Sequence, residues 1–491
     1  MTTPAPARVS HDARQRTAAP KLVLATTFMG IFLLNFNAMA MNVALPGIGR
    51  AFGGSMAGLQ WIVDAYTLMF AALLLSAGAL SDRIGASRAF GAGVAVFTAA
   101  SAACGLAPGL GALVAARLFQ GSAAAIMLPS SLALVRQAFP DAAERARAIA
   151  LWTVGGAVAV AAGPVVGGVL SSILSWRAIF VVNLPVGIAT LAVLTRVERS
   201  PRRPTPLDPY AQLTAIVALA MLTFAVIDGG ENGFGEPLVL GGLGLAAVAT
   251  AAFIMIEART AAPIVPLGLF RSRTVSVSVT IGFVVNAAFY GSVFVLSLFF
   301  QDVLNLSAMA TGLMFLPMLV VIAGANLASA KAAARCGPRM PIAVGQAIFA
   351  LAMFGLLWMD EGTSRPVIAA MLIPIGLGLG LVVPSLTAVL LNDIAADRAG
   401  MAAGILNSFR QTGGALAVAV FGALVADRRE FVVGLRVALS IAAVLLVATT
   451  IAAWGGFRPV SGRKPSPSSA TCRWRRRRRR RLRACRRRGR G

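Results

Sequence analysis

Three ionisable side chains lie well inside long apolar stretches of the sequence and are the first candidates for chemistry. They are one acid, Asp64, and two bases, Arg117 and Arg410. Ionisable groups in an apolar setting are costly, which makes them functional candidates by default. A buried carboxylate near a cation can bind and release a proton near neutral pH. We therefore expect Asp64 to exchange protons with Arg117 nearby; the alternative is a structural hydrogen bond or ion pair near its helix end.

Further polar side chains within the apolar stretches are candidates for lining an interior cavity. Asn407 and Gln411 flank Arg410, and these three residues form a polar strip that should face other helices rather than lipid. The remaining candidates are Asn37, Asn42 and Tyr66. Either arginine, Arg117 or Arg410, could instead tie one helix to its neighbour.

Metal and enzyme chemistry find no support in the sequence. The cysteines form neither a CxxC pair nor a metal-binding spacing, and the single histidine, His11, lies in the polar N-terminal tail. The cysteines are Cys104, Cys336, Cys472 and Cys485. We therefore expect no zinc or haem site and no cofactor. Intramembrane proteases need paired carboxylates or a Ser/His site, and we find neither, so we do not expect an enzyme.

The composition indicates that membrane-spanning helices carry these residues. Of 491 residues, 58% are hydrophobic and 13% are charged, with a mean hydropathy of +0.80, whereas soluble domains average about 25% charged residues. About 20 apolar residues cross the bilayer core as a helix. Fourteen stretches of roughly this length lie at 22–44, 59–79, 89–107, 110–135, 148–172, 178–196, 210–228, 238–256, 275–298, 308–330, 340–359, 367–391, 400–426 and 432–456. We predict an all-α membrane protein with fourteen transmembrane helices.

Basic residues gather in alternate loops, which predicts the orientation in the membrane. Arg83 and Arg88 lie in the second loop and Arg145 and Arg147 in the fourth, whereas the seventh loop has acids and no base. The positive-inside rule then places both termini in the cytoplasm. The first apolar stretch is too long for a signal peptide and no cleavage site follows it. We expect a multi-pass protein of the plasma (inner) membrane.

The two halves of the chain echo each other at offsets of 252 to 255 residues. The matched segments are Arg83-Ile84-Gly85 with Arg335-Cys336-Gly337, Leu128-Pro129-Ser130 with Val383-Pro384-Ser385, and Glu144-Arg145-Ala146 with Asp397-Arg398-Ala399. Several matches near one offset indicate duplication. Duplicated bundles with a site between them are typical of secondary transporters. We therefore predict two pseudo-symmetric six-helix bundles with two helices inserted between them.

This duplication divides the chain into six parts. They are a cytoplasmic tail (1–21), an N-terminal six-helix bundle (22–196), a linker (197–209), two inserted helices (210–256), a C-terminal six-helix bundle (257–456) and a disordered basic tail (457–491). From Arg463 onward the basic tail carries fifteen Lys and Arg, in a chain whose net charge is +26. We expect it to lie near anionic lipid rather than to bind nucleic acid; the alternative is a reading frame lost after the last helix.

A strip of small residues runs along the stretch 148–172. Gly155, Ala159, Gly163, Gly167 and Ser171 recur every four residues, with Pro164 and Gly168 beside them. Such strips let two helices in lipid approach closely, and the proline should bend its helix. Ordinary tight packing is the alternative interpretation.

The segment that joins the second and third stretches carries a charged motif. Its residues are Gly78, Asp82, Arg83, Gly85 and Arg88. The glycines suit a close helix approach and a tight turn, and the charges can make charge-assisted contacts to a neighbouring helix. A solvated turn is the alternative, but the echo at Arg335–Arg339 favours a conformational latch.

Taken together, these motifs resemble those of the major facilitator superfamily, in its fourteen-helix branch of drug:proton antiporters. The Gly78–Arg88 segment resembles the loop motif of that family. Arg117 with Gln120-Gly121 resembles the fourth-helix motif associated with proton coupling, and Gly163-Pro164 with Gly167-Gly168 the fifth-helix motif of exporters. Three further segments resemble features of the fourteen-helix branch. They are Asn42-Val43-Ala44-Leu45-Pro46, Trp176-Arg177 through Asn183-Leu184-Pro185, and Arg410-Gln411 with Gly413-Gly414.

The resemblance implies an exporter of small amphipathic drugs or antibiotics, driven by proton antiport and alternating access. Its partners would be the substrate, protons and the lipid bilayer, and the proton gradient would replace a cofactor. One position departs from the family pattern, because Asn37 stands where many members have an aspartate tied to proton exchange. An amide cannot titrate near neutral pH, which leaves Asp64 with Arg117. An exporter of one metabolite, an uptake symporter and a non-transporting receptor are the alternatives.

Overall fold

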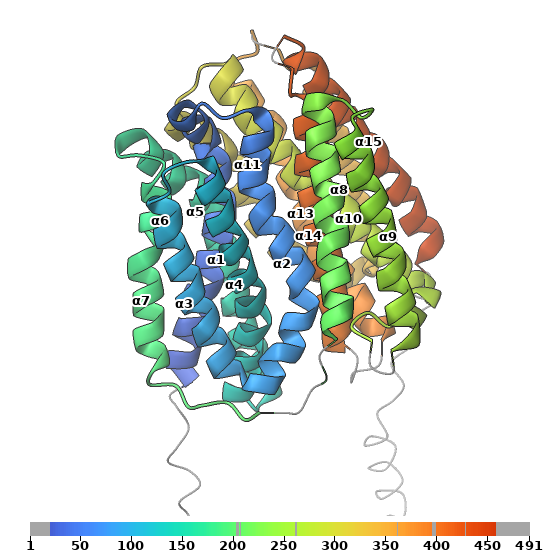
Figure 1. Cartoon of the computed structure of the whole chain (residues 1–491). Helices are drawn as coiled ribbons and strands as arrows, with labels where there is room; N and C mark the ends of the chain where they lie inside the picture. Colours follow the sequence, from blue (N-terminus) through green and yellow to red (C-terminus); the bar gives the residue numbers. More distant parts are fainter. Residues whose placement is uncertain are drawn as a thin grey trace, which may run out of the picture. The chain divides into compact units, whose positions relative to one another are not determined.

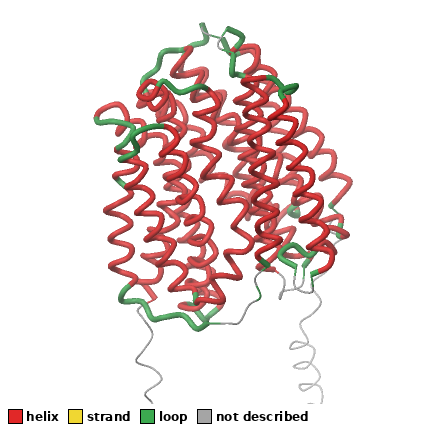
Figure 2. Tube along the Cα trace, in the orientation of Figure 1, coloured by secondary structure: helices red, strands yellow, loops and turns green. Residues whose placement is uncertain are grey.

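The computed structural model describes residues 20–202, 206, 208–260, 263–360, 362–394, 399–427 and 429–457. These residues form helices joined by loops, without a strand (Figure 2). The chain divides into two compact units, residues 1–456 and 457–491. His11, Cys472, Cys485, Asp397-Arg398 and all of the predicted basic tail but Phe457 lie outside the described residues.

The helices follow the predicted apolar stretches closely. They are α1 (Pro20–Phe52), α2 (Met56–Ile84), α3 (Ala86–Gly105), α4 (Leu110–Ala138), α5 (Ala142–Ile173), α6 (Ala178–Val181), α7 (Asn183–Leu194), α8 (Pro209–Asn232), α9 (Pro237–Arg259), η2 (Leu267–Arg271), α10 (Arg273–Leu298), η3 (Phe299–Val303), α11 (Ala308–Cys336), α12 (Arg339–Gly355), η4 (Leu356–Trp358), α13 (Arg365–Asp393), α14 (Ala399–Leu424) and α15 (Phe431–Gly456).

Among the described residues, twelve helices are long and apolar enough to cross a membrane. The two remaining predicted stretches are α14 and the shorter apolar pair α6–α7. The stretch 178–196 was predicted as one helix but breaks at Val182. Pro185 explains the break, because it has no N–H to donate to the carbonyl of Val181.

Side-chain caps and glycines fix several helix ends. Ser55 begins α2 by accepting from the Gly58 N–H at 3.3 Å, and Asp141 begins α5 by accepting from two backbone N–H groups at 2.9 Å. Gly85 and Gly337 occupy corresponding turns of the two halves, with φ of 94° and 76°. Both values favour glycine, so the echo seen in the sequence recurs in the backbone.

The packing of the helices repeats between the two halves (Figure 1). Helix α1 packs along α5 as α10 packs along α14, and α2 along α4 as α11 along α13. The halves meet through two further pairs, α5 with α11 and α2 with α14. These pairs correspond to each other under the same duplication, so two six-helix bundles face each other across a pseudo-symmetric interface.

The inserted helices α8 and α9 pack on each other, and α8 also contacts α2 and α14. Gln212 of α8 donates to the Ala72 carbonyl at 2.9 Å, and Ser55 donates to Glu231 at 3.2 Å. Helix α8 is thus tied to α2 near both of its ends. It flanks the α2–α14 interface between the bundles.

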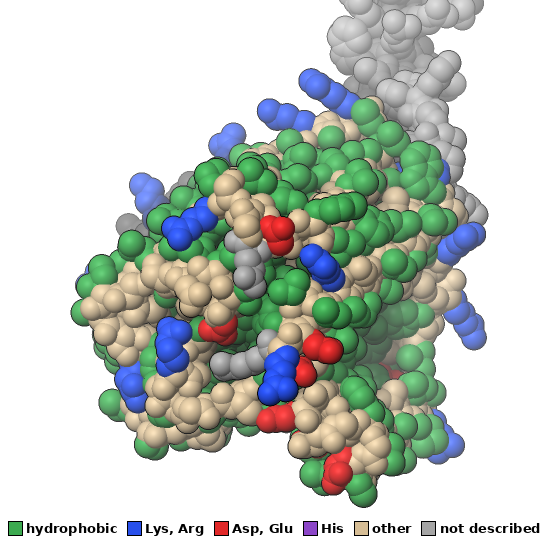
Figure 3. Space-filling view, turned by 90° about the horizontal axis from the view of Figure 1, so that it is seen from above, with side chains coloured by type: hydrophobic (Ala, Val, Ile, Leu, Met, Phe, Trp, Pro, Cys, Tyr) green, Lys and Arg blue, Asp and Glu red, His purple; other side chains and the backbone are tan. Residues whose placement is uncertain are grey.

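The two ends of the helical unit differ in charge. The helix ends on either side of the turns after α2, α4 and α11 carry Arg83, Arg88, Arg145, Arg335 and Arg339, and we call this the basic end. The turns after α1, α8 and α14 lie at the other end, which we call the acidic end after Asp228, Glu231, Glu236, Asp427 and Glu430. Figure 3 views the acidic end and shows acidic side chains interspersed with Arg and Lys.

Candidate functional site

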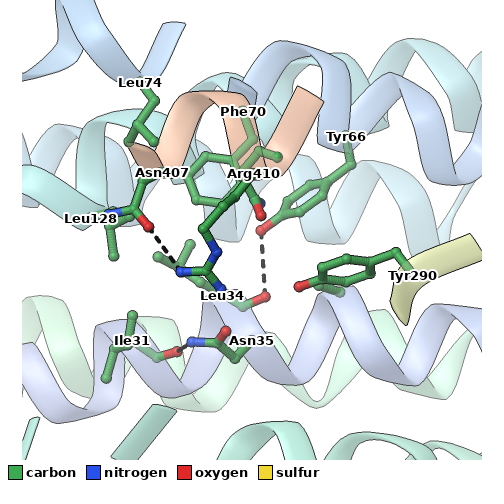
Figure 4. Close-up of a pocket in the computed structure, with 12 residues that line it drawn as sticks. Ile31, Leu34, Asn35, Tyr66, Phe70, Leu74, Leu128, Tyr290, Asn407 and Arg410 are labelled. Carbon is green, nitrogen blue, oxygen red and sulfur yellow. Dashed lines mark hydrogen bonds between the residues drawn. The ribbon is translucent and has the colours of Figure 1, made fainter. Parts of the chain in front are cut away.

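A cavity of about 170 Å³ lies between the two bundles (Figure 4). Helices α1, α2 and α4 contribute one wall, and α10 and α14 the other. Its lining residues are Ile31, Leu34, Asn35, Ala38, Tyr66, Phe70, Leu74, Leu128, Tyr290, Asn407, Arg410 and Gln411. The walls are apolar and aromatic with a few polar side chains, as in many small-molecule sites.

Amide groups hold Arg410 in this cavity. Its Nε donates to Asn286 Oδ1 at 3.1 Å and its Nη1 to Asn407 Oδ1 at 3.3 Å. Asn286 Nδ2 in turn donates to Gln411 Oε1 at 3.4 Å. Gly282 leaves room for the arginine stem, because a Cβ there would lie 3.0 Å from Arg410 Cγ. The strip of Asn407, Arg410 and Gln411 therefore lines the cavity, together with Tyr66.

Arg117 lies outside the cavity, buried within the N-terminal bundle. Its Nη1 donates to Asn37 Oδ1 and to Gln120 Oε1, the latter at 2.8 Å. Its Nε donates to the Ile62 carbonyl at 2.9 Å. The guanidinium also stacks over the ring of Tyr66, with Cζ 4.4 Å from the ring centroid. Arg117 thus joins α4 to α1 and α2, and it contacts Tyr66, which lines the cavity.

Asp64 is fully buried but makes no ion pair with Arg117. Its Oδ1 accepts from Thr67 Oγ1 at 3.4 Å, and Oδ2 has no hydrogen-bond partner in the described part of the chain. Gln60 and Ala71, on the same face of α2, bond to α14: Gln60 Nε2 donates to the Ala419 carbonyl and Ser408 to the Ala71 carbonyl, both at 2.8 Å. Asp64 therefore lies at the interface between the bundles.

Asn37 and Asn42, which we expected to line the cavity, are not among its lining residues in this structure. Asn37 faces Arg117, and Asn42 Nδ2 donates to the Ala38 carbonyl at 3.2 Å. Asn42 lies farther toward the acidic end of α1, where its own carbonyl accepts from Ser297 of α10 at 2.7 Å. Instead Asn35 supplies the polar group of α1 in the cavity.

Asn35 and Tyr290 line the cavity but were not predicted from the sequence. Asn35 shares a helical face with Ile31 and Ala38, but Asn37 lies on another face of α1, so the polar residues of this helix do not single out one face. Tyr290 belongs to no motif. The one signal that could have found it is its position on α10, the helix that packs along the polar strip of α14.

Hydrogen bonds join the two bundles mainly toward the acidic end. Gln301 Nε2 donates to the Val43 carbonyl at 3.0 Å, and the Met309 N–H donates to Ser172 Oγ at 3.1 Å. The Gln60 and Ser297 bonds lie at the same end. Within the described residues, the remaining bond between the bundles, from Ser408 to Ala71, lies near the middle. The cavity is therefore closed off toward the acidic end.

The small-residue strip of α5 contacts two different helices. A Cβ at Gly163 would lie 2.6 Å from Met39 Cβ, and one at Gly167 would lie 2.8 Å from Ala40 Cβ, so both residues let α5 approach α1. Gly155 similarly meets Phe28 of α1, and Ala159 is buried. A Cβ at Gly168 would instead lie 2.5 Å from the Ala308 oxygen of α11, and Gly312 of α11 packs on the Pro164 carbonyl. One side of α5 thus seals the α5–α11 interface between the bundles.

The charged motif at the basic end makes few contacts to other helices. Asp82 and Arg83 are exposed and make no hydrogen bond or ion pair among the described residues. Arg88 donates to the Ile84 carbonyl at 3.3 Å, and Ser87 exchanges hydrogen bonds with Ser200 at 2.8 and 3.1 Å. A Cβ at Gly78 would have no neighbour within 4 Å. The conformational latch predicted for this segment therefore stays a prediction.

Comparison with known proteins adds a family match and several relatives. The sequence model of one protein family, the Major Facilitator Superfamily, matches residues 27–418 of this chain. The multidrug resistance protein Stp of Mycobacterium tuberculosis is 37% identical over 410 residues, which cover 82% of this chain and 76% of the relative. The methylenomycin A resistance protein of Streptomyces coelicolor is 32% identical, covering 87% and 90%. A crystal structure of a D-xylose–proton symporter has a TM-score of 0.67 at 12% identity, covering 91% of this chain and 99% of that one.

Proposed function

Because this chain belongs to the Major Facilitator Superfamily, we propose that it exports small amphipathic compounds, antibiotics among them, by proton antiport. It is a multi-pass membrane protein, and we place it in the plasma (inner) membrane with the basic end and both termini in the cytoplasm. The names of its relatives support drug or antibiotic efflux. The same relatives leave a single-metabolite exporter as the narrower form of this proposal.

The observation that carries the proposal is the cavity between the bundles. It combines apolar and aromatic walls with a few polar groups, and the hydrogen bonds between the bundles close it toward the acidic end. With the basic end in the cytoplasm, such a state takes substrate from the inner side. Rocking of the bundles about the cavity would then open the acidic end and release the substrate outside.

Asp64 is the best placed group to couple protons to this movement. It is buried at the α2–α14 interface, which must separate when the acidic end opens, and one of its carboxyl oxygens has no partner in the described part of the chain. An ionised carboxylate without a partner is poorly tolerated in a dry interface, whereas a protonated one can stay there. Proton binding at Asp64 would therefore favour closure of the acidic end, and proton loss would favour its opening.

The proposal is tested by drug susceptibility in a host that lacks its own efflux pumps. We expect expression of the chain to raise the inhibitory concentration of several amphipathic antibiotics. The Asp64→Asn variant, at equal expression, should give the same inhibitory concentrations as cells without the protein. Resistance to one compound alone would favour the single-metabolite exporter. No change across a broad panel, with the protein present in the membrane, would refute export.

A further inference from the structure

We infer that the cavity selects amphipathic compounds that carry a negative charge, with Arg410 as the residue that pairs with it. This inference rests on the proposed function and specifies its substrate class. The observation behind it is the charge of the lining: Arg410 is the one charged side chain among the lining residues, and none of them is an acid.

Arg410 has no anionic partner in the described part of the chain. Its two hydrogen bonds go to the neutral amide oxygens of Asn286 and Asn407, and its Nη2 has no acceptor there. Arg410 is half-buried, and a charge withdrawn from water is normally paired, because an unpaired charge loses hydration without compensation. The planar guanidinium fork matches a carboxylate in a bidentate geometry. A substrate anion can therefore supply the partner that the protein does not.

The other polar groups of the cavity supply donors for the same anion. Tyr66 O–H is held only by a long 3.4 Å bond to the Leu34 carbonyl. Tyr290 O–H and Gln411 Nε2 have no acceptor among the described residues. Figure 4 shows Tyr66, Tyr290 and Arg410 extending into the cavity from three different helices. The acceptors that remain are neutral amide and carbonyl oxygens, which do not compensate a cation.

A second cation, the buried Arg117, reinforces the positive potential. Arg117 stacks on the ring of Tyr66, a residue of the cavity wall, and its hydrogen-bond partners are also neutral. Asn37 is the partner that could have been an acid, but an amide leaves the charge of Arg117 in place. The single buried acid nearby, Asp64, faces the α2–α14 interface and does not line the cavity. An anion is therefore favoured in the cavity and a lipophilic cation is disfavoured.

The test compares naphthalene carboxylates with naphthylmethyl-trimethylammonium ions, which are permanently charged cations of similar shape, measured as uptake into everted vesicles that contain the full chain. We expect faster uptake of the carboxylates. Arg410→Gln should reduce their uptake about tenfold or more, the scale of a charge-assisted hydrogen bond, and Arg410→Lys should restore part of it. Arg436→Gln removes an exposed arginine of α15 and is the matched control.

The outcomes separate this inference from the proposed function. Faster uptake of the trimethylammonium cations, or unchanged carboxylate uptake by a folded Arg410→Gln variant, would overturn the inference and leave export standing. If neither set of compounds is taken up and the inhibitory concentration of no antibiotic in the panel is raised, export itself is refuted. If Arg410→Gln fails to fold, the charge preference of the unmodified protein still decides.

Discussion

At the scale of single residues, the amide of Asn37 determines how Arg117 is used. A carboxylate at this position would form a titratable ion pair with the arginine, whereas the amide is an uncharged acceptor that does not titrate near neutral pH. Arg117 can then hold α1, α2 and α4 together throughout the cycle. The proton-binding role passes to Asp64, the buried acid at the α2–α14 interface.

We expect Asp64→Asn to abolish proton-coupled transport while the protein stays folded, because an amide fits the same space but cannot bind or release a proton. The measurement is substrate uptake in everted vesicles driven by an imposed pH gradient, with folding checked by size-exclusion chromatography. Asp427→Asn, at an exposed acid of the acidic end, is the matched control. Full coupled uptake by Asp64→Asn would remove this residue from the proton path.

We expect Asn37→Asp to be accommodated and to change the pH profile of transport. The new carboxylate would accept the Arg117 N–H that the amide oxygen accepts now, and it would add a second titratable group. The measurement is the uptake rate as a function of pH at matched expression. A pH profile identical to that of the unmodified protein would show that a charge at position 37 does not reach the coupling step.

At the scale of elements, α5 performs two packing tasks with adjacent faces. Gly163 and Gly167 let it approach α1 inside its own bundle, whereas Gly168 lets it approach α11 of the other bundle. The interface within a bundle must persist, but the interface between bundles must open and close. The small-residue strip of α5 therefore contributes to one interface that persists within a bundle and to one that opens and closes between the bundles.

This division predicts different outcomes for similar substitutions in α5. Gly163→Leu should lower the stability of the protein, by about 1–3 kcal/mol for overpacking. Gly168→Leu should spare folding but block transport, because it prevents closure against Ala308. Thermal unfolding and vesicle uptake distinguish the two effects. Gly241→Leu in α9 is the matched control, since a Cβ there meets nothing within 4 Å; equal behaviour of both α5 variants would contradict the division.

The helices could be predicted from the sequence because the bilayer requires long apolar segments. The stretch 110–135, for example, became α4 (Leu110–Ala138). Polar residues on amphipathic surfaces were also predictable, as Asn407, Arg410 and Gln411 show. The rotation of α1 was not, because the polar residues of this helix do not single out one face, and so Asn37 and Asn42 were expected in the cavity instead of Asn35.

At the scale of the whole molecule, the duplicated bundles meet through corresponding helix pairs, and most of their hydrogen bonds lie toward the acidic end. Backbone carbonyls accept many of these bonds, so the contacts depend on helix position more than on particular partners. Helix α8 is bonded to α2 and also packs on α14. We infer that α8 moves with the N-terminal bundle and slides along α14.

A reversible cross-link at the acidic end tests whether it must open. A Cβ at Gly422 of α14 would lie 2.7 Å from Gln60 Cγ of α2, so Gln60→Cys with Gly422→Cys should form a disulfide once the native cysteines are replaced. We expect oxidation to stop uptake and a reductant to restore it, with each single variant unaffected by oxidation. Full transport by the cross-linked protein would mean that these ends stay together throughout the cycle.

The central proposal is that the protein exchanges protons for a small amphipathic substrate. The most direct measurement uses everted vesicles with an acidic interior and follows the pH gradient as compounds from the susceptibility panel are added. We predict that transported compounds accumulate inside and collapse the gradient at the same time, and that Asp64→Asn does neither. Vesicles that contain the folded protein but show neither uptake nor gradient collapse across the panel would contradict proton-coupled export.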